Sequence, residues 1–350
     1  MFKPKYRLTH TLVKYLTQIS DYRSSILNAR LVPKWAVNLR KEALIRSTYA
    51  STSIEGNPLS FEEVSDLMIG RDVLALTKDK KEVINYFSAL EKLDNLTINQ
   101  KPVLTQADVL ALHKLITKGV LKSTKYVGKY RSDKEYVLLR NRASGEVTYL
   151  PPPTKKVPQL MADLLAWINV NQETDLNPVL EAGIVHYELV RIHPFMDGNG
   201  RTGRALATLI LIRRGFDTKR FFSLDDFYNS DRERYYQVLK SVHEQDYDLT
   251  KWLEYFGEGV AISLKSVKDK ILKLGGLKKQ NSEEPQISLR NDQIKIIELA
   301  NQNGSVTNRE VQKLLRVSNK KAYQLLHELV NLKILMRVGL GRSVRYTNKT

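Results

Sequence analysis

The chain has 350 residues, enough for about two domains of ~100–200 residues each, and 42% of them are hydrophobic, which suffices for a packed core. Lys and Arg outnumber Asp and Glu by 56 to 38, giving a formal net charge of +18. This balance is typical of proteins that bind polyanions such as nucleotide phosphates or nucleic acid, and it equally fits a solvated basic surface. The absence of cysteine excludes disulfides and thiolate metal sites.

The sequence contains no candidate membrane span. Its longest mainly apolar run, Ala205–Ile212, which contains one threonine, is far shorter than the ~20 residues that a spanning helix needs. The amino-terminal residues 1–16 mix basic and apolar side chains, whereas a signal peptide separates them. We therefore expect a cytoplasmic protein that does not contact a membrane.

The hydrophobic pattern predicts a mainly α fold, because apolar residues recur at helical spacing through most of the chain. Asn177 is a plausible N-cap before Pro178, which is tolerated in a first helical turn. The predicted helical segments are Pro33–Ser53, Phe61–Ile69, Lys81–Leu93, Thr105–Leu115, Val157–Asn169, Pro178–Val190 and Gly200–Arg214.

One stretch departs from the helical pattern. Residues 136–140 and 146–150 are predicted to be strands joined by a turn at 141–145, and three prolines follow at 151–153. Two strands alone are only marginally stable. We therefore expect this hairpin to pack on the helices or to pair with another segment.

The end of the chain predicts a second, smaller domain. Residues 275–285 are polar and contain glycine, as in a linker. Three helical segments and a terminal hairpin then predict a winged helix-turn-helix. The segments are a helix to Ala300, Thr307–Leu315 opened by a Thr307–Glu310 capping box, Ser318–Asn331, and two strands between Ile334 and Tyr346.

The most informative stretch is His193–Arg204, HPFMDGNGRTGR, between two predicted helices. Gly198, Asn199 and Gly200 adopt positive φ at little cost, so their backbone amides could form an anion-binding nest. The helix that follows would offer its free amino-terminal amides to the same anion. The loop therefore has the backbone features of a phosphate site.

Charged side chains in the same stretch point to the same chemistry. Arg201 and Arg204 are three residues apart, so both could reach phosphates. Asp197 is a hard oxygen ligand of the kind that Mg²⁺ takes beside substrate phosphates. His193 can accept a proton near neutral pH. Together these residues predict a phosphoryl-transfer site.

Other interpretations of this stretch are weaker. Gly198, Gly200 and Gly203 match the dinucleotide pattern G-x-G-x-x-G, but that pattern requires a preceding strand and βα units. A Walker loop is excluded because no lysine and hydroxyl pair follows the glycines. A plain inter-helix turn would explain the glycines but not the acid, the histidine and two arginines within the same short stretch.

The stretch resembles the signature of the Fic (filamentation induced by cyclic AMP) family, HPFx[DE]GNGRxxR, at every fixed position. The resemblance extends over about residues 30–260 and includes Gly128–Arg131, the triple proline, Ser223–Phe227 and Tyr235–Tyr236. It implies a Fic-type helical core with a β-hairpin flap, followed by the small winged helix-turn-helix domain. The flap would align an extended segment of the target by strand pairing, or serve only as a structural arm.

The resemblance implies a protein adenylyltransferase that moves AMP from ATP to a Ser, Thr or Tyr hydroxyl of a target protein or of itself. His193 would deprotonate the hydroxyl, Asp197 would hold Mg²⁺, and Phe195 would anchor the loop. Asn199 and the loop amides would steady the transferred phosphoryl, Arg201 would bind the β-phosphate and Arg204 the γ-phosphate, and Tyr236 would lie near the adenine. The implied ATP-binding set is Gly198, Asn199, Gly200, Arg201, Thr202, Gly203, Arg204 and Tyr236.

A second motif, Ser51–Asn57, has two interpretations. Gly56 is a natural residue just past a helix end, so the motif could be a helix terminus. It also resembles the inhibitory pattern [ST]xxxE[GN] of the Fic class in which an inhibitory helix precedes the active site. Ser51 and Glu55 share one helix face, and the implied role is a salt bridge from Glu55 to Arg204 that displaces the γ-phosphate. Both interpretations can hold at once.

The expected layout and the alternative functions follow from these motifs. The same site could instead remove AMP, with Glu55 activating water, or the chain could be a DNA-binding regulator with an inactive Fic scaffold. Residues 286–350, the tail of the chain, have 12 Lys and Arg against 4 Asp and Glu, a net charge of +8. This tail could bind DNA or serve protein interaction or homodimerisation. Tail residues available to DNA are Asn319, Lys320, Lys321 and Gln324. The layout is an amino-terminal helical region 1–110, a catalytic core 111–260, a helix and linker 261–285, and the winged helix domain 286–350.

Overall fold

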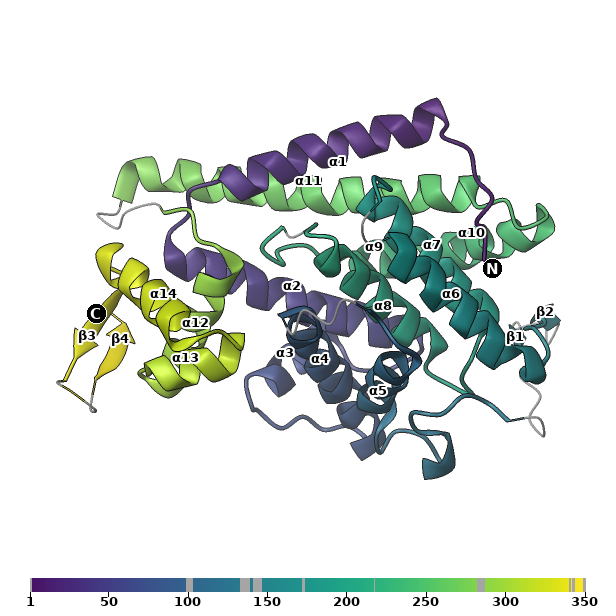
Figure 1. Ribbon diagram of the computed structural model, residues 1–350, viewed down its shortest axis with the longest axis horizontal. Coiled ribbons are helices and arrows are strands. Elements are labelled where there is room, and N and C mark those ends of the chain that lie inside the picture. Colours follow the sequence, from purple (N-terminus) through teal and green to yellow (C-terminus); the bar gives the residue numbers. More distant parts are fainter. Residues whose placement is uncertain are drawn as a thin grey trace. The chain divides into compact units, whose positions relative to one another are not determined.

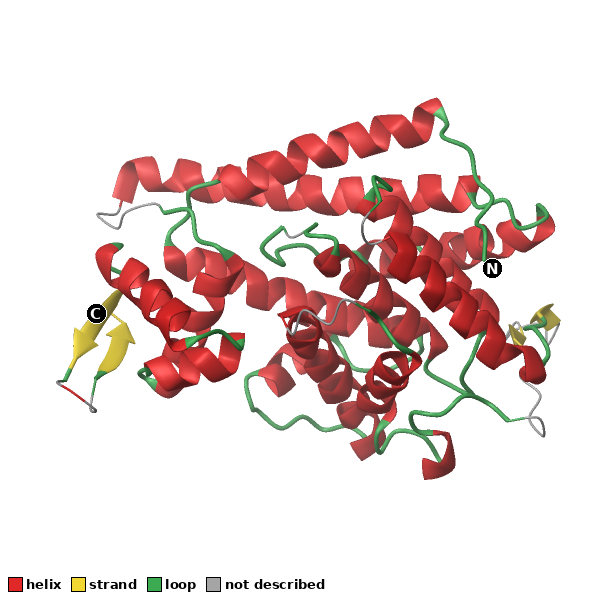
Figure 2. Cartoon of the chain, viewed as in Figure 1, coloured by secondary structure: helices red, strands yellow, loops and turns green. Residues whose placement is uncertain are grey.

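The structure, a computed structural model, describes residues 2–98, 103–132, 139–140, 147–171, 174–216, 218–281, 287–339, 341 and 344–348. The described residues are mainly helical, with two small two-stranded antiparallel sheets (Figure 2). The expected mainly α fold is confirmed. Within these ranges no helix combines the length and apolar character required to cross a membrane.

The chain divides into two compact units, each assembled from separate stretches of sequence. Unit 1 comprises 1–21, 44–217 and 223–264, and unit 2 comprises 22–43, 218–222 and 265–350. Three long helices contribute residues to both units: α1 (His10–Asn28), α2 (Pro33–Ile54) and α11 (Thr250–Asn281). The four-part layout expected from the sequence stays a prediction.

Unit 1 contains the described helices that surround the motif His193–Arg204. Figure 1 labels them in chain order. They are α3 (Phe61–Met68), α4 (Thr77–Ile98), α5 (Gln106–Thr117), α6 (Val157–Asn171), α7 (Pro178–Ile192), α8 (Asn199–Arg213), α9 (Asp225–Ser230) and α10 (Arg232–Glu244), with the 3₁₀ turns η1 (Thr124–Tyr126) and η2 (Thr154–Lys156).

Helices α7 and α8 form the centre of unit 1 and pack against each other. Helix α7 is apolar almost all round, as in a fully buried helix. The predicted cap is confirmed, because the Asn177 side chain accepts a hydrogen bond from Val179 N at 2.9 Å. Gly183 lets α11 approach α7 closely, because a Cβ at this position would lie 2.9 Å from Leu253 Cδ2. Trp252 Nε1 of α11 donates a hydrogen bond to Gly183 O at 2.8 Å. The motif is thus framed by two tightly packed helices.

Most differences from the predicted elements concern helices without a strong motif. Helices α1, α9, α10 and the start of α11 were not predicted from the pattern. Helix α11 also continues through Gly275 and Gly276 to Asn281, where the glycines had suggested a linker. A glycine inside a helix costs only about 1 kcal/mol relative to alanine, so two of them do not end a long helix.

The predicted hairpin is present as an antiparallel pair, β1 (Leu139–Arg140) and β2 (Val147–Tyr149). The predicted strand residues 136–138 and the turn residues 141–145 lie outside the described residues. Tyr149 Oη donates to Arg191 O at 2.7 Å, and its ring meets His243 edge-on at 5.6 Å. The pair therefore packs on the helices, as expected from the low stability of two isolated strands.

Unit 2 contains the predicted three helices and terminal hairpin. They are α12 (Asn291–Asn303), α13 (Asn308–Leu315), α14 (Asn319–Asn331), β3 (Leu335–Val338) and β4 (Arg345–Asn348). Strands β3 and β4 are antiparallel, and a further bridge joins Val306 to Tyr346. The predicted capping box is formed, with Thr307 N donating to Glu310 at 2.7 Å and Glu310 N to Thr307 Oγ1 at 3.3 Å.

Candidate active site

The motif forms a tight loop between α7 and α8. His193 closes α7 in the left-handed region at φ 51°, an uncommon conformation for a residue with a side chain. Gly198 begins α8 at φ 82°, and a Cβ there would lie 2.9 Å from Thr117 Cγ2. Asn199 and Gly200 do not have the expected positive φ, because both lie in the first turn of α8. The loop therefore presents the amino-terminal amides of α8 to an anion.

The His193 ring is held by a hydrogen bond to the backbone of α7. Its Nδ1 lies 3.2 Å from Val190 O, and because a carbonyl only accepts, Nδ1 carries the proton. The free lone pair is then on Nε2. Burial lowers the pKa of His193 to about 4, partly opposed by the hydrogen bond to Val190. The imidazole is therefore neutral at physiological pH and able to accept a proton.

Phe195 and Asn199 brace the loop. The Phe195 side chain is fully buried, which confirms its expected role as an anchor. The Asn199 side chain accepts from Phe195 N at 2.9 Å and donates to Phe195 O at 2.8 Å. The resemblance implied that Asn199 steadies the phosphoryl, but here its side chain closes the loop upon itself.

His113 of α5 supports the loop and was not identified from the sequence. Its ring stacks on Phe195 at 3.7 Å with an interplanar angle of 2°. Nδ1 accepts from Gly128 N at 3.0 Å, so Nε2 is the atom that donates to Asp197 O, also at 3.0 Å. Burial lowers the pKa of His113 to about 4, which keeps this neutral tautomer. A histidine in an apolar helix has the same pattern as a core residue, so the sequence carries no signal for this contact.

Arg131 ties the loop to the segment that follows the hairpin. Its Nε donates to His193 O and its backbone N to Pro194 O, both at 2.9 Å. The other end of the guanidinium donates to Thr154 Oγ1 at 2.7 Å and to Pro152 O at 2.5 Å. This gives the Gly128–Arg131 flank a physical role: the arginine fixes the backbone that carries His193.

Asp197 provides a carboxylate suited to Mg²⁺. Its side chain is 54% exposed, and Oδ1 accepts from Gly198 N at 2.5 Å and from Arg201 Nη2 at 3.1 Å. Over the described ranges, no group of three or more His, Asp or Glu could hold a metal ion by itself. An accessible carboxylate nevertheless fits Mg²⁺, which is commonly held by one or two carboxylates and substrate phosphates.

Arg204 is buried beside the Ser51–Asn57 motif. Its Nε donates to Ser51 Oγ at 2.7 Å, and Nη2 donates to Ser51 O at 2.9 Å and to Glu55 Oε1 at 2.8 Å. Asp225 Oδ1 lies 3.4 Å from Nε. Burial raises the pKa of Asp225 to about 6, while the Arg204 charge lowers it. The Glu55–Arg204 ion pair implied by the resemblance is therefore present.

The helix-terminus interpretation of Ser51–Asn57 also holds. Helix α2 ends at Ile54, Gly56 follows at φ 94°, and Gly56 N donates to Ser53 O at 3.0 Å. Gly200 lets this end approach α8, because a Cβ at Gly200 would collide with Glu55 Oε1. One turn of sequence therefore both ends a helix and places a carboxylate against Arg204.

Arg201 is buried between two carboxylates. Its Nη1 donates to Glu82 Oε1 of α4, and its Nη2 donates to Asp197 at 3.1 Å. Glu82 was not identified from the sequence. The remaining predicted residues of α8 point inward: Thr202 is fully buried, and a Cβ at Gly203 would lie 3.2 Å from Val190 Cγ2.

Tyr236 of α10 lies at the edge of the Ser51–Asn57 motif. Its side chain is 49% exposed and its Oη lies 3.5 Å from Ile54 O. Its ring also contacts that of Tyr235, at a centroid distance of 5.2 Å. The structure therefore brings the predicted base, acid, arginines and tyrosine to one region of unit 1.

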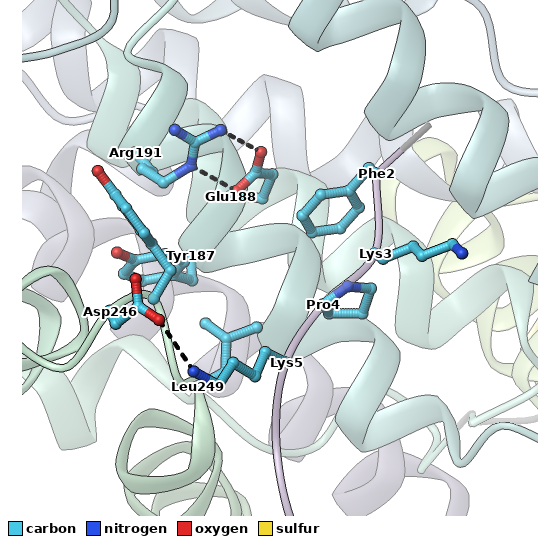
Figure 3. A pocket seen from close by; sticks show the side chains of 10 residues that line it. Phe2, Lys3, Pro4, Lys5, Tyr187, Glu188, Arg191, Asp246 and Leu249 are labelled. Carbon is cyan, nitrogen blue, oxygen red and sulfur yellow. Dashed lines mark hydrogen bonds and ion pairs between the residues drawn. The ribbon is translucent and has the colours of Figure 1, made fainter.

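A separate pocket of about 360 Å³ lies beside α7 (Figure 3). The Phe2–Lys5 segment forms one wall, and the Arg191 side chain binds Glu188 through bonds of 2.7 and 2.6 Å. A second ion pair joins Lys5 to Asp246 at 3.0 Å. None of the residues that line this pocket belongs to His193–Arg204. The pocket is therefore distinct from the motif.

Comparison with known proteins identifies a family domain within this chain. Residues 103–211 match the family model of the Fic/DOC family. This chain contains a Fic/DOC family domain. The match includes the whole of His193–Arg204, and the described helices α5–α8 lie within it, apart from the last residues of α8.

Curated relatives and solved structures are similar to this chain. It is 29% identical over 66% of its length to a protein adenylyltransferase Fic of Aedes aegypti, and 31% identical over 59% to that of Drosophila mojavensis. The chain spans only 43% and 38% of these two relatives. A Fic family protein from Desulfovibrio desulfuricans is 26% identical, with a TM-score of 0.64 and coverage of 99% of this chain and 98% of that one. For Fic-1 of C. elegans the identity is 26%, the TM-score 0.59 and the coverage 77% and 74%.

Proposed function

We propose that this protein transfers AMP from ATP to a Ser, Thr or Tyr hydroxyl of a target protein or of itself. The supporting observation is that His193 is buried and neutral, and that it begins the loop leading into α8, whose first turns carry the buried Arg201 and Arg204. The names of the insect relatives, protein adenylyltransferase Fic, support the same activity. Phosphoryl chemistry requires mainly positioning and charge neutralisation, which this arrangement supplies.

In this mechanism the target hydroxyl oxygen attacks the α-phosphorus of ATP. The oxygen–phosphorus ester bond forms while the bond from the α-phosphorus to the bridging oxygen breaks, and pyrophosphate leaves. The hydroxyl proton passes to His193 Nε2, the unprotonated ring nitrogen. Arg131 keeps this ring in place through the His193 carbonyl.

The other residues bind and orient the nucleotide. The amino-terminal amides of α8 and Arg201 would bind phosphate oxygens, Arg204 would bind the γ-phosphate, and Tyr236 would contact the adenine. Asp197 would hold Mg²⁺, which neutralises charge on the phosphates. The antiparallel pair β1–β2 would offer its edge to an extended target segment.

We also propose that Glu55 inhibits this transfer. Its Oε1 accepts a hydrogen bond of 2.8 Å from Arg204 Nη2, the group expected to bind the γ-phosphate. Arg204 is buried and held by Ser51 on another side, so it cannot turn outward to reach the nucleotide while Glu55 stays bound. The same partly exposed carboxylate could activate water, which keeps AMP removal as the alternative activity of this site.

The decisive test uses ATP labelled at different phosphates. We expect the full chain with Glu55→Gly, incubated with Mg²⁺ and α-labelled ATP, to produce a labelled protein band, either its own or that of an added target. The same reaction with γ-labelled ATP should leave protein unlabelled. Label from the γ position would indicate a kinase, and release of AMP from a modified target by the wild type would indicate removal.

We propose a second function for unit 2, binding of duplex DNA through a winged helix. Helix α14 buries Leu325 and Leu329 and exposes Lys320, Lys321 and Gln324 on its other face. The order of helices and hairpin in this unit is that of a winged helix-turn-helix, in which such a helix enters the major groove. The net charge of +8 over residues 286–350 favours the same partner.

We expect the full chain to bind duplex DNA with a steep salt dependence, each neutralised phosphate adding ~0.9 to the slope of log K against log salt. Lys320→Ala with Lys321→Ala should weaken binding and lower this slope by about 2. The exposed Lys78 and Lys251 of unit 1, replaced together by alanine, are the matched control. Fluorescence anisotropy measures both, and an unchanged slope in the α14 variant would rule out this surface.

A further inference from the structure

We propose that Glu82 is the positioning residue for Arg201 and couples it to the inhibitory segment Ser51–Asn57. Glu82 lies on α4, outside the motif His193–Arg204 and outside that segment. One carboxylate oxygen accepts from Arg201 Nη1 and the other accepts from Asn57 Nδ2 at 2.8 Å. This inference rests on the proposed function, because it assigns Arg201 to the β-phosphate of a nucleotide.

The two carboxylates bound to Arg201 differ in their access to solvent. The Glu82 side chain is 9% exposed, whereas that of Asp197 is 54% exposed. A buried carboxylate that left its arginine would remain as an unpaired charge in the protein interior, which is costly. Asp197 can exchange Arg201 for a metal ion, which would free Nη2 for a phosphate. Glu82 is therefore the fixed partner of Arg201, and Asp197 is the exchangeable one.

Asn57 links Glu82 to the segment that carries Glu55. Its Nδ2 also donates to Asp79 O at 3.1 Å, and its Oδ1 accepts from Leu59 N at 3.2 Å. Its backbone N donates to Thr52 O at 3.1 Å in the turn that ends α2. Every polar group of this asparagine side chain is thus bonded, so the end of the inhibitory segment is fixed to the same carboxylate that orients Arg201.

The proposed role of Arg201 predicts that AMP and ADP bind differently, because they differ in the number of phosphates. AMP has no β-phosphate and does not use Arg201, whereas ADP does. ADP also lacks the γ-phosphate that Glu55 displaces, so its binding isolates the role of Arg201 in the wild-type chain. Loss of a charge-assisted partner typically changes affinity by about tenfold or more.

The experiment measures the affinities of the full chain for AMP and Mg·ADP by isothermal titration calorimetry. We expect Glu82→Gln to weaken ADP binding by about tenfold and AMP binding by less than about twofold. Glu82→Asp, which keeps the charge, should recover part of the preference for ADP. Glu91→Gln, at an exposed glutamate of the same helix, is the matched control and should leave both affinities unchanged.

Coupling is tested with double variants. Glu82→Gln combined with Arg201→Ala should add little to either single loss in ADP affinity, because both act through one contact. Asn57→Ala should reduce the ADP preference in the wild type and have no further effect in Glu82→Gln. Equal losses for AMP and ADP, or none, would overturn the inference while leaving nucleotide binding intact. A wild type that binds neither nucleotide would instead overturn the proposed function and the inference with it.

Discussion

Replacing His193 with alanine is expected to abolish AMP transfer while ATP still binds. The imidazole is the group at the loop that can take the hydroxyl proton, and loss of a general base costs about 10²–10⁴-fold in rate. The phosphate contacts belong to other groups: the α8 amides, Arg201 and Arg204. The rate is measured with α-labelled ATP in the Glu55→Gly background, and binding by calorimetry. The control is His10→Ala at an exposed position of α1.

The pKa of His193 can be tested directly. The ordinary histidine pKa of about 6.5 would leave the ring partly charged at pH 6, whereas burial lowers the pKa of His193 to about 4. The His193 ring resonance, identified by its loss in His193→Ala, should therefore stay unshifted from pH 8 down to about pH 5 in an NMR titration. A titration centred near 6.5 would show that His193 is solvated, and retained transfer by the alanine variant would remove it from the mechanism.

The sequence predicted the local features of the site well because they are encoded by neighbouring residues. The loop His193–Arg204 lies between two helices as expected, with Phe195 buried as its anchor. The Asn177 cap and the Thr307–Glu310 capping box also formed. Each of these features depends on spacing within a few residues, which a single sequence displays.

The supporting residues could not be predicted because their contacts join distant parts of the chain. His113 bonds to a residue 84 positions away, and Glu82 bonds to one 119 positions away. Asp225 lies within Ser223–Phe227, but no neighbouring residue in the sequence indicates an arginine as its partner. A buried carboxylate or histidine has no local pattern, so these contacts depend on how α4, α5 and α9 pack on α8.

The Glu55–Arg204 ion pair carries the largest expected gain in activity. Glu55→Gly removes the carboxylate that lies 2.8 Å from Arg204 Nη2. The γ-phosphate would then meet Arg204 Nη2 without the negative charge of Glu55 beside it. A small misplacement of the reacting centre can cost ~10²-fold in rate, so transfer should rise by at least about that factor. The rise is measured as the initial rate of label incorporation from α-labelled ATP, including self-modification.

Removal of Glu55 should leave the arginine in place. Asp225 stays 3.4 Å from Arg204 Nε, and Ser51 supplies two further acceptors at 2.7 and 2.9 Å. The buried guanidinium therefore keeps a counter-charge, and the variant should unfold close to the wild-type temperature. Glu55→Gln, which keeps the size of the side chain without its charge, should give a smaller gain.

A double-variant cycle decides whether the gain passes through Arg204. Adding Arg204→Ala to Glu55→Gly should remove most of the increase, because the two residues act through one contact. Arg204→Ala alone should not raise the rate, because it removes the γ-phosphate ligand together with the inhibitor's anchor. Equal or lower transfer in Glu55→Gly would show that Ser51–Asn57 is only a helix terminus. A full gain that survives Arg204→Ala would mean that Glu55 acts on another group, and His193 is a candidate because the Glu55 charge raises its pKa.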